Sequence, residues 1–122
     1  MPGPLRVAIV DDDADIRGLI ALHMSLDERF EVIAEAPDGT SAIRLLERSD
    51  IDAMVLDMHM PVVSGRQVLQ AAREHRPDIR VVAYSADLGI LLQAEGEGAA
   101  ATVAKGDTLD RLLEALISGR AA

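Results

Sequence analysis

Short apolar runs alternate along the chain with segments whose apolar residues recur at helical spacing. Strands buried inside a parallel sheet are typically near-continuous runs of aliphatic residues, and most of these apolar runs fit that description. We expect five strands, at residues 5–10, 30–35, 53–56, 80–85 and 101–104. Because helical segments separate the strands, they should form a parallel sheet with helices on both faces, the α/β class.

Helical spacing and helix-end signals indicate five helices. They are expected at residues 14–26, around 43–46, and at 65–75, 88–96 and 109–117. Residues 37–41 (PDGTS) have the composition of a turn, and Asp107 is expected to cap the last helix. The apolar face of the first helix is expected to consist of Ile16, Leu19, Ile20 and Met24.

The fourth helical segment contains more glycine than a stable helix favours. Gly89, Gly96 and Gly98 punctuate it, and a glycine inside a helix costs about 1 kcal/mol relative to alanine. We therefore expect this helix to be short or mobile.

Composition narrows the class of protein. A length of 122 residues suits one domain, and a net charge of −9 argues against nucleic-acid binding, which needs clustered Lys and Arg. The absence of cysteine excludes disulfides and thiolate zinc sites. The sequence has no long apolar segment, and its start lacks the pattern of a signal peptide. A cytoplasmic location is therefore the default expectation, and we expect this chain not to bind a membrane.

Polar residues follow four of the five predicted strands. Asp11 and Asp12 follow the first strand, Asp57 ends the third, Ser85 ends the fourth and Lys105 follows the fifth. Each alone has an ordinary explanation, as a helix N-terminus, a turn or a strand end. In open α/β sheets, however, ligands bind beside the carboxyl ends of the strands, so their convergence predicts a functional site.

The residue types at this edge favour a site for a cation and an anion together. Lys105 is the only lysine among twelve basic residues, and its ammonium is a compact charge that suits a narrow site. Three neighbouring carboxylates repel one another unless they take up protons, bind a cation or stand apart. Hard carboxylate oxygens suit Mg²⁺ or Mn²⁺. A lone histidine between two methionines, His59, fits packing or the surface better than metal ligation.

These residues resemble the motifs of a known family. Val-Asp-Asp at 10–12, Asp-Met-His-Met-Pro at 57–61, Ser-Ala at 85–86 and the late Lys105 are similar to a response-regulator receiver domain of the chemotaxis-regulator type. The resemblance covers essentially the whole chain. It implies a flavodoxin-like fold with strand order 2-1-3-4-5, and a single receiver domain over residues 1–122 with no output domain in this chain.

The resemblance also implies catalytic roles. Asp57 would accept a phosphoryl group from a phosphohistidine on a sensor histidine kinase or a phosphotransfer protein. Ser85 would donate a hydrogen bond to a phosphoryl oxygen, and Lys105 would pair with the phosphoryl group or with Asp57. Phosphoryl transfer depends mainly on positioning and charge neutralisation, which these groups supply.

The same resemblance implies a Mg²⁺ site. Asp12 and Asp57 would bind the ion directly, Asp11 mainly through water, and the backbone carbonyl of His59 would be a further ligand. Two side positions are expected to tune the lifetime of the phosphoryl group: His59, two residues after the acceptor, and Asp87, two residues after Ser85.

One position departs from the family pattern. Receiver domains usually carry Tyr or Phe three residues before the lysine, as a ring that swings inward on activation, and this chain has Thr102 there. We expect phosphorylation to pull Ser85 inward and to reorganise the fourth and fifth strand–helix units into a new docking face. Thr102 should change that output and leave the chemistry intact. Tyr84 could supply part of the missing bulk, although an ordinary core or rim tyrosine is the favoured interpretation.

The leading hypothesis is a signalling switch that alters binding to a downstream protein target, as a monomer or as a phosphorylation-linked dimer. It would assist its own phosphorylation and dephosphorylation without being an enzyme. Two alternatives are a receiver fragment of a longer transcriptional regulator and a receiver-like adaptor that takes no phosphate. A third is a Mg²⁺-dependent phosphatase with an aspartate nucleophile. Such enzymes resemble each other in having a second acid two residues after the nucleophile, and His59 at that position disfavours this alternative.

Overall fold

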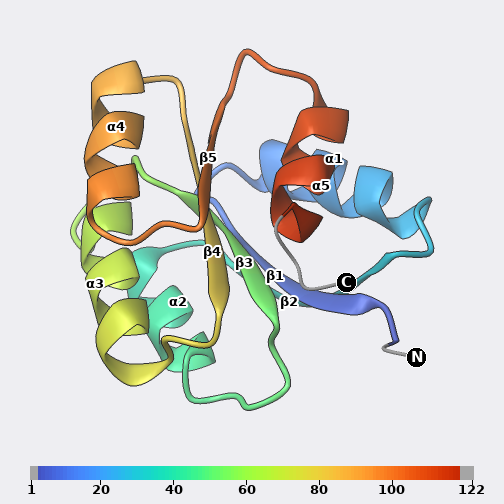
Figure 1. Cartoon of the computed structure of the whole chain (residues 1–122), viewed down its shortest axis with the longest axis horizontal. Helices are drawn as coiled ribbons and strands as arrows, with labels where there is room; N and C mark the ends of the chain where they lie inside the picture. The colour runs from blue at the N-terminus through green and yellow to red at the C-terminus, as the bar shows by residue number, and fades with distance from the viewer. Residues whose placement is uncertain (1–2, 119–122) are drawn as a thin grey trace.

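Strands and helices alternate strictly along the chain in the computed structural model, which describes residues 3–118 (Figure 1). The strands are β1 (Leu5–Val10), β2 (Phe30–Ala36), β3 (Ala53–Asp57), β4 (Arg80–Ser85) and β5 (Ala101–Ala104). The helices are α1 (Ala14–Ser25), α2 (Gly39–Leu45), α3 (Gly65–His75), α4 (Leu88–Gly96) and α5 (Leu109–Ile117). None of these helices has the length and apolar character needed to cross a membrane.

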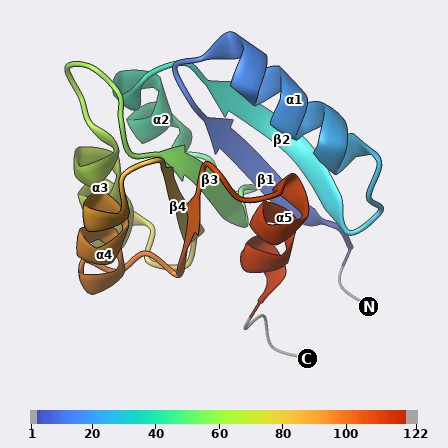
Figure 2. The ribbon, with the colours of Figure 1, turned by 90° about the horizontal axis from the view of Figure 1, so that it is seen from above.

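The strands form one parallel sheet in the order β2-β1-β3-β4-β5, as expected. Helices α1 and α5 cover one face of the sheet, and α2, α3 and α4 cover the other (Figures 1 and 2). Strand order reverses between β1 and β3, which are hydrogen-bonded neighbours. The carboxyl ends of β1 and β3 therefore form the crevice where open α/β sheets bind ligands.

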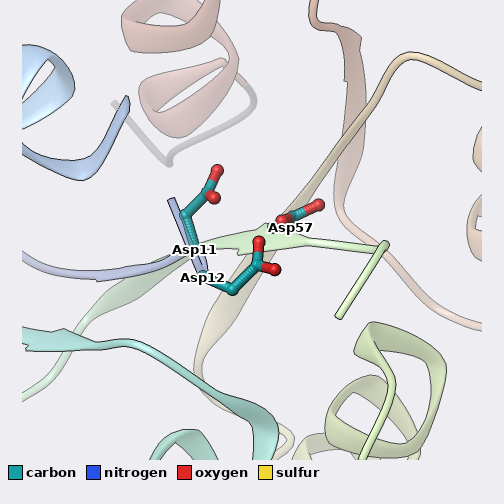
Figure 3. Close-up of side chains that lie close together, drawn as sticks. All are labelled: Asp11, Asp12 and Asp57. Atoms are coloured by element: carbon teal, nitrogen blue, oxygen red, sulfur yellow. The ribbon is translucent and has the colours of Figure 1, made fainter. Parts of the chain in front are cut away.

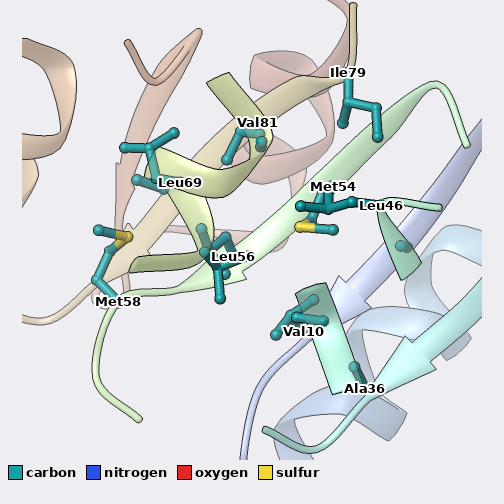
Figure 4. Packing of buried hydrophobic residues seen from close by; sticks show 14 of the residues in the cluster. Val10, Ala36, Leu46, Met54, Leu56, Met58, Leu69, Ile79 and Val81 are labelled. Carbon is teal, nitrogen blue, oxygen red and sulfur yellow. The ribbon is translucent and has the colours of Figure 1, made fainter. Parts of the chain in front are cut away.

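Two aliphatic cores sandwich the sheet. The larger core fills the space between the sheet and α2, α3 and α4, and Figure 4 shows Val10, Met54 and Leu56 there, with Leu69 of α3 packed against them. The smaller core lies under α1 and α5 and contains both aromatic residues, Phe30 and Tyr84. All five residues of β3 are buried, because the strand is central in the sheet and covered on both faces.

Two helix starts differ from the sequence-based expectation. Residues 39–41 belong to the first turn of α2 and not to a free turn, because the carboxylate of Asp38 accepts a hydrogen bond from the Ser41 N–H and caps the helix. The cap of α5 is Thr108, whose hydroxyl accepts from the Arg111 N–H, so the expectation of Asp107 was wrong. Asp107 instead forms an ion pair with Arg111, four residues later, and its Oδ2 lies 3.6 Å from Nε of the arginine.

The glycines of α4 lie at its ends and not in its interior. Gly89 is the second residue of the helix, Gly96 is the last, and Gly98 lies beyond it with a φ of +104°. Glycine tolerates that left-handed conformation and often ends a helix there. The helix is nine residues long, the same length as α5, so the glycines do not make it unusually short. That the helix is mobile stays a prediction.

The apolar face of α1 is narrower than expected. Ile20 and Met24 are buried against the sheet and Ile16 is half-buried, whereas Leu19 is 57% exposed. Leu19 therefore lies outside the buried face of the helix. Leu22 and Leu26 are exposed as well, so α1 carries apolar residues on its outer side in addition to its buried face.

Candidate functional site

Three carboxylates from two neighbouring strands meet at the carboxyl edge of the sheet (Figure 3). Asp11 and Asp12 follow β1 directly and Asp57 is the last residue of β3, so the pairing of these strands brings the residues together. One oxygen of each lies within 4.8 Å of the others. Asp11 and Asp57 are each 1% exposed, and Asp12 is exposed.

The carboxylate of Asp57 is only partly satisfied. Its Oδ1 accepts a hydrogen bond from the His59 N–H at 2.9 Å and lies 3.4 Å from the ammonium of Lys105. Its Oδ2 is buried and has no hydrogen-bond partner among residues 3–118. A buried, unpaired carboxylate oxygen is costly, so this atom marks the place where a ligand would be stabilised.

Lys105 reaches the cluster from the loop after β5. Its backbone N–H donates to the Ser85 carbonyl at 2.9 Å, which continues the β4–β5 pairing past the end of the strand. Its ammonium lies 3.3 Å from Oδ2 of Asp11 and 3.4 Å from Oδ1 of Asp57. One positive charge is therefore shared by the two buried carboxylates.

Burial and neighbouring charges shift the protonation equilibria of this pair. The pKa of Asp57 is raised to about 6, mainly by burial; the charge of Asp11 contributes to the rise, while the His59 N–H and Lys105 oppose it. Burial alone would lower the pKa of Lys105, but the charges of Asp57 and Asp11 outweigh it and raise that pKa. The lysine therefore stays charged, while the charged form of the Asp57 carboxylate is held at an energetic cost.

Ser85 and Asp87 are linked at the start of α4. The Ser85 side chain is fully buried, and its Oγ accepts a hydrogen bond from the Asp87 N–H at 3.0 Å. No hydrogen bond donated by the Ser85 hydroxyl is found among residues 3–118. The carboxylate of Asp87 caps α4, since its Oδ1 accepts from the N–H groups of Gly89 and Ile90. This cap was not among the expectations from sequence, although an aspartate just before a helical segment is the usual signal for one.

The structure places His59 and Thr102 outside the carboxylate cluster. The His59 side chain is exposed, and its backbone N–H holds the Asp57 carboxylate. Thr102 pairs in register with Ala83 and lines an open hollow of about 570 Å³ between β5 and α5. The hollow is bounded by Ala101, Thr102, Val103, Arg111, Glu114, Ala115, Ile117 and Ser118.

Tyr84 is a core residue, as favoured from the sequence, and it is 5% exposed. It packs with Val103 in the core under α1 and α5, while Ala83, the register partner of Thr102, belongs to the opposite core. Side chains alternate between the two faces of a sheet. Tyr84 therefore does not fill the space that an aromatic residue at Thr102 would occupy.

Arg17 supports the site and escaped the sequence analysis. Its guanidinium donates to the backbone carbonyl of Asp11 at 2.7 Å and lies 3.4 Å from the carboxylate of Glu35 on β2. Asp13 caps α1, and its backbone N–H donates to Oδ1 of Asp11 at 2.8 Å. The loop after β1 is thus held from both sides. The only signal in the sequence is an arginine one turn into the helix, which is too common to single out.

Comparison with known proteins identifies the family. The model of the response regulator receiver domain matches residues 7–117. The nitrate/nitrite response regulator protein NarP of Escherichia coli is 36% identical over 121 residues, covering 95% of this chain and 55% of NarP. The protein-glutamate methylesterase/protein-glutamine glutaminase 1 of Rhodospirillum rubrum is 34% identical over 110 residues, covering 87% of this chain and 28% of the relative. The chain thus spans about half or less of these relatives.

Solved structures share the fold over nearly the whole chain. The signal receiver domain of the response regulator NarL from Mycobacterium tuberculosis has a TM-score of 0.88 at 32% identity, covering 98% of this chain and all of that one. CheY in its complex with CheX, beryllofluoride and Mg²⁺ from Borrelia burgdorferi has a TM-score of 0.85 at 25% identity. The match covers 98% of this chain and 91% of that one. On the matched motifs, the fold and these relatives, this chain belongs to the response regulator receiver domain family of two-component signalling.

Proposed function

We propose that the domain is a phosphorylatable switch that accepts a phosphoryl group on Asp57 from a phosphohistidine of a sensor histidine kinase or a phosphotransfer protein. The observation that carries this proposal is the state of Asp57: a buried carboxylate with one unpartnered oxygen beside a lysine ammonium. A nucleophile needs a free oxygen, and phosphoryl transfer needs positive charge close to it. Membership of the receiver family supports the same role and a cytoplasmic location.

The three carboxylates fit a divalent cation. Their oxygens lie within 4.8 Å of one another, and Oδ2 of Asp57 has no other partner among residues 3–118. Both oxygens of Asp11 are engaged, one by the Asp13 N–H and one by Lys105, whereas Asp12 is exposed. We therefore assign direct ligation of Mg²⁺ or Mn²⁺ to Asp12 and Asp57, and ligation through water to Asp11, with the His59 carbonyl as a further ligand. The bound ion would neutralise charge on the phosphoryl group.

The chain's own residues divide the transfer between them. A carboxylate oxygen of Asp57 attacks the phosphorus, and the new O–P bond forms as the N–P bond breaks. The partner phosphohistidine, protonated on its second ring nitrogen, keeps the electron pair of the N–P bond and leaves as a neutral imidazole. The ammonium of Lys105 stabilises negative charge on the phosphoryl oxygens, and the buried hydroxyl of Ser85 donates a hydrogen bond to one of them. The phosphoryl group ends on the domain itself, so we propose a switch and not an enzyme.

The output of the switch would be a docking face on α4, β5 and α5. When Ser85 turns to a phosphoryl oxygen, its hydrogen bond with the Asp87 N–H at the start of α4 must change. Leu88 and Leu92 are exposed on α4, at 67% and 71%, and supply an apolar surface for a downstream protein. Thr102 carries no aromatic ring that could move inward, so the output would differ from that of receivers with an aromatic residue there.

A receiver that forms part of a longer regulator is the second reading. The lengths of the relatives favour it, because the matched region is 28% of the methylesterase and 55% of NarP. The chemistry at Asp57 would be the same, and the docking face would act on the rest of the same protein.

Phosphorylation itself is the first test. Incubation with Mg²⁺ and acetyl phosphate should give a labile adduct of one phosphoryl group by intact-protein mass spectrometry. Asp57→Asn should give none, because the nucleophile is gone, while Asp78→Asn, at an exposed carboxylate remote from the site, should behave as wild type. No adduct in the wild-type protein would favour the adaptor, and rapid turnover of phosphate esters would favour the phosphatase.

The pH dependence of stability tests the environment of Asp57. Its native pKa of about 6 exceeds the ordinary 3.8, so the folded state binds the proton more tightly. The free energy of unfolding should therefore fall as the pH rises through this window, by roughly 2–3 kcal/mol in Mg²⁺-free buffer. Asp57→Asn should lack this loss and be more stable above about pH 7. Urea denaturation at several pH values measures the difference, and a gap independent of pH would contradict the assignment.

Amide hydrogen exchange tests the docking face. Adding Mg²⁺ and beryllofluoride, a phosphoryl analogue, should change the amide exchange rates mainly within residues 86–106. Ser85 and Lys105 lie at the two ends of that segment, and both would contact the phosphoryl group. Helix α1, on the other side of the site, should change less. Unaltered exchange within 86–106 would show that the switch lies elsewhere.

The lifetime of the phosphoryl group tests Asp87. Removing its carboxylate should lengthen the half-life without blocking phosphorylation, because an acceptor for the attacking water is lost. Asp87→Ala also removes the cap of α4, at a cost of about 1 kcal/mol, so Asp87→Asn, which keeps a capping oxygen, is the matched variant. Dephosphorylation is followed after the phosphodonor is removed. An unchanged half-life in both variants would leave Asp87 as a helix cap alone.

A further inference from the structure

The ammonium of Lys105 has a third neighbour besides its two carboxylates. It lies 5.4 Å from the centre of the Tyr84 ring, within the range of a cation–π interaction, which gains strength when the pair is desolvated. Tyr84 is buried, and the Lys105 side chain is only 23% exposed. The contact therefore lies inside the site and not on the surface.

The sheet fixes the ring where the lysine needs it. Tyr84 pairs in register with Asp57 on one side and with Val103 on the other, so its backbone lies directly between the acceptor strand and the strand that leads to Lys105. The ring is packed in the core under α1 and α5 with Val103 and Leu112. A buried ring on a central strand is a rigid support, whereas the lysine stem has four flexible carbons.

We infer that Tyr84 is a positioning residue that holds the Lys105 ammonium at the phosphorylation site; this inference rests on the proposed function. The two carboxylates cannot hold the ammonium alone when a divalent cation is bound, because Asp11 and Asp57 then share their negative charge with that ion. The ring of Tyr84 carries no formal charge and is no ligand for Mg²⁺. It is the contact of Lys105 for which the metal does not compete.

The chain contains a matched control for this contact. Phe30 lies in the same core as Tyr84, is buried to the same degree at 6% exposed, and has the guanidinium of Arg29 at 5.4 Å from its ring centre. That pair lies at the start of β2, at the opposite end of the strands from the site. Phe30→Leu therefore removes an equivalent buried ring without touching Lys105.

The experiment compares Tyr84→Leu, Tyr84→Phe and Phe30→Leu in the full chain. Lys105 is the only lysine, so protein labelled with ¹³C-lysine gives one set of side-chain NMR signals without assignment. The signals of the Cε group should show a ring-current shift in wild type, in Tyr84→Phe and in Phe30→Leu. That shift should be lost in Tyr84→Leu. A shift that persists in Tyr84→Leu would overturn the proposal, whatever the phosphorylation chemistry.

Phosphorylation by acetyl phosphate gives the second measurement. Tyr84→Leu should react roughly 3- to 30-fold more slowly at saturating Mg²⁺, the range that a cation–π contact corresponds to. The Mg²⁺ concentration for half-maximal rate should not change, since Tyr84 is no ligand. Tyr84→Phe should restore the rate, and Phe30→Leu should match wild type. An unchanged rate in Tyr84→Leu overturns the positioning role, whereas a wild-type protein that takes no phosphoryl group overturns the proposed function itself.

Discussion

The ammonium of Lys105 stands 3.3 Å from Asp11 and 3.4 Å from Asp57, and both carboxylates are buried. Without that shared charge, two buried anions would face each other at the edge of the sheet, where the effective dielectric constant is low and repulsion is strong. The lysine offsets only part of this repulsion, because Oδ2 of Asp57 stays without a partner among residues 3–118. The site is therefore stable enough to fold and still short of positive charge. That residual deficit of positive charge would favour a bound cation.

The fold supplies this arrangement by placing β3 at its centre. Every residue of the strand is buried, and its final residue is the carboxylate. Neighbouring strands then bring one group each to the same edge: Asp11 from β1, Ser85 from β4 and Lys105 after β5. Packing energy from the two aliphatic cores holds the strands in register, and this energy outweighs the cost of the buried charges.

Sequence patterns were sufficient for the strands and for the edge where the polar groups meet. Apolar runs separated by helical segments admit few topologies, so the position of Asp57 follows from the run that ends on it. The patterns failed where a neighbour in space decides the outcome. The cap of α5 falls on Thr108 because its hydroxyl reaches the Arg111 N–H, and Asp107, one residue earlier, was an equally good candidate from sequence. The contact of Tyr84 with Lys105 spans two strands and leaves no local signal.

The glycines near the site show that the loop after β3 is tightly packed and the loop after β5 is not. A Cβ at Gly65 would lie 2.5 Å from the Asp57 carbonyl oxygen, and one at Gly39 would collide with the Val63 backbone. The loop after β3 is thus wedged between the first turns of α2 and α3, with backbone against backbone. At Gly106, in the loop after β5, a Cβ would meet no atom within 4 Å among residues 3–118 other than its immediate chain neighbours. The loop after β5 therefore has more room at its glycine than the loop after β3 has at its contacts with Gly39 and Gly65, so a movement that starts at Asp57 would be accommodated more easily on the β5 side.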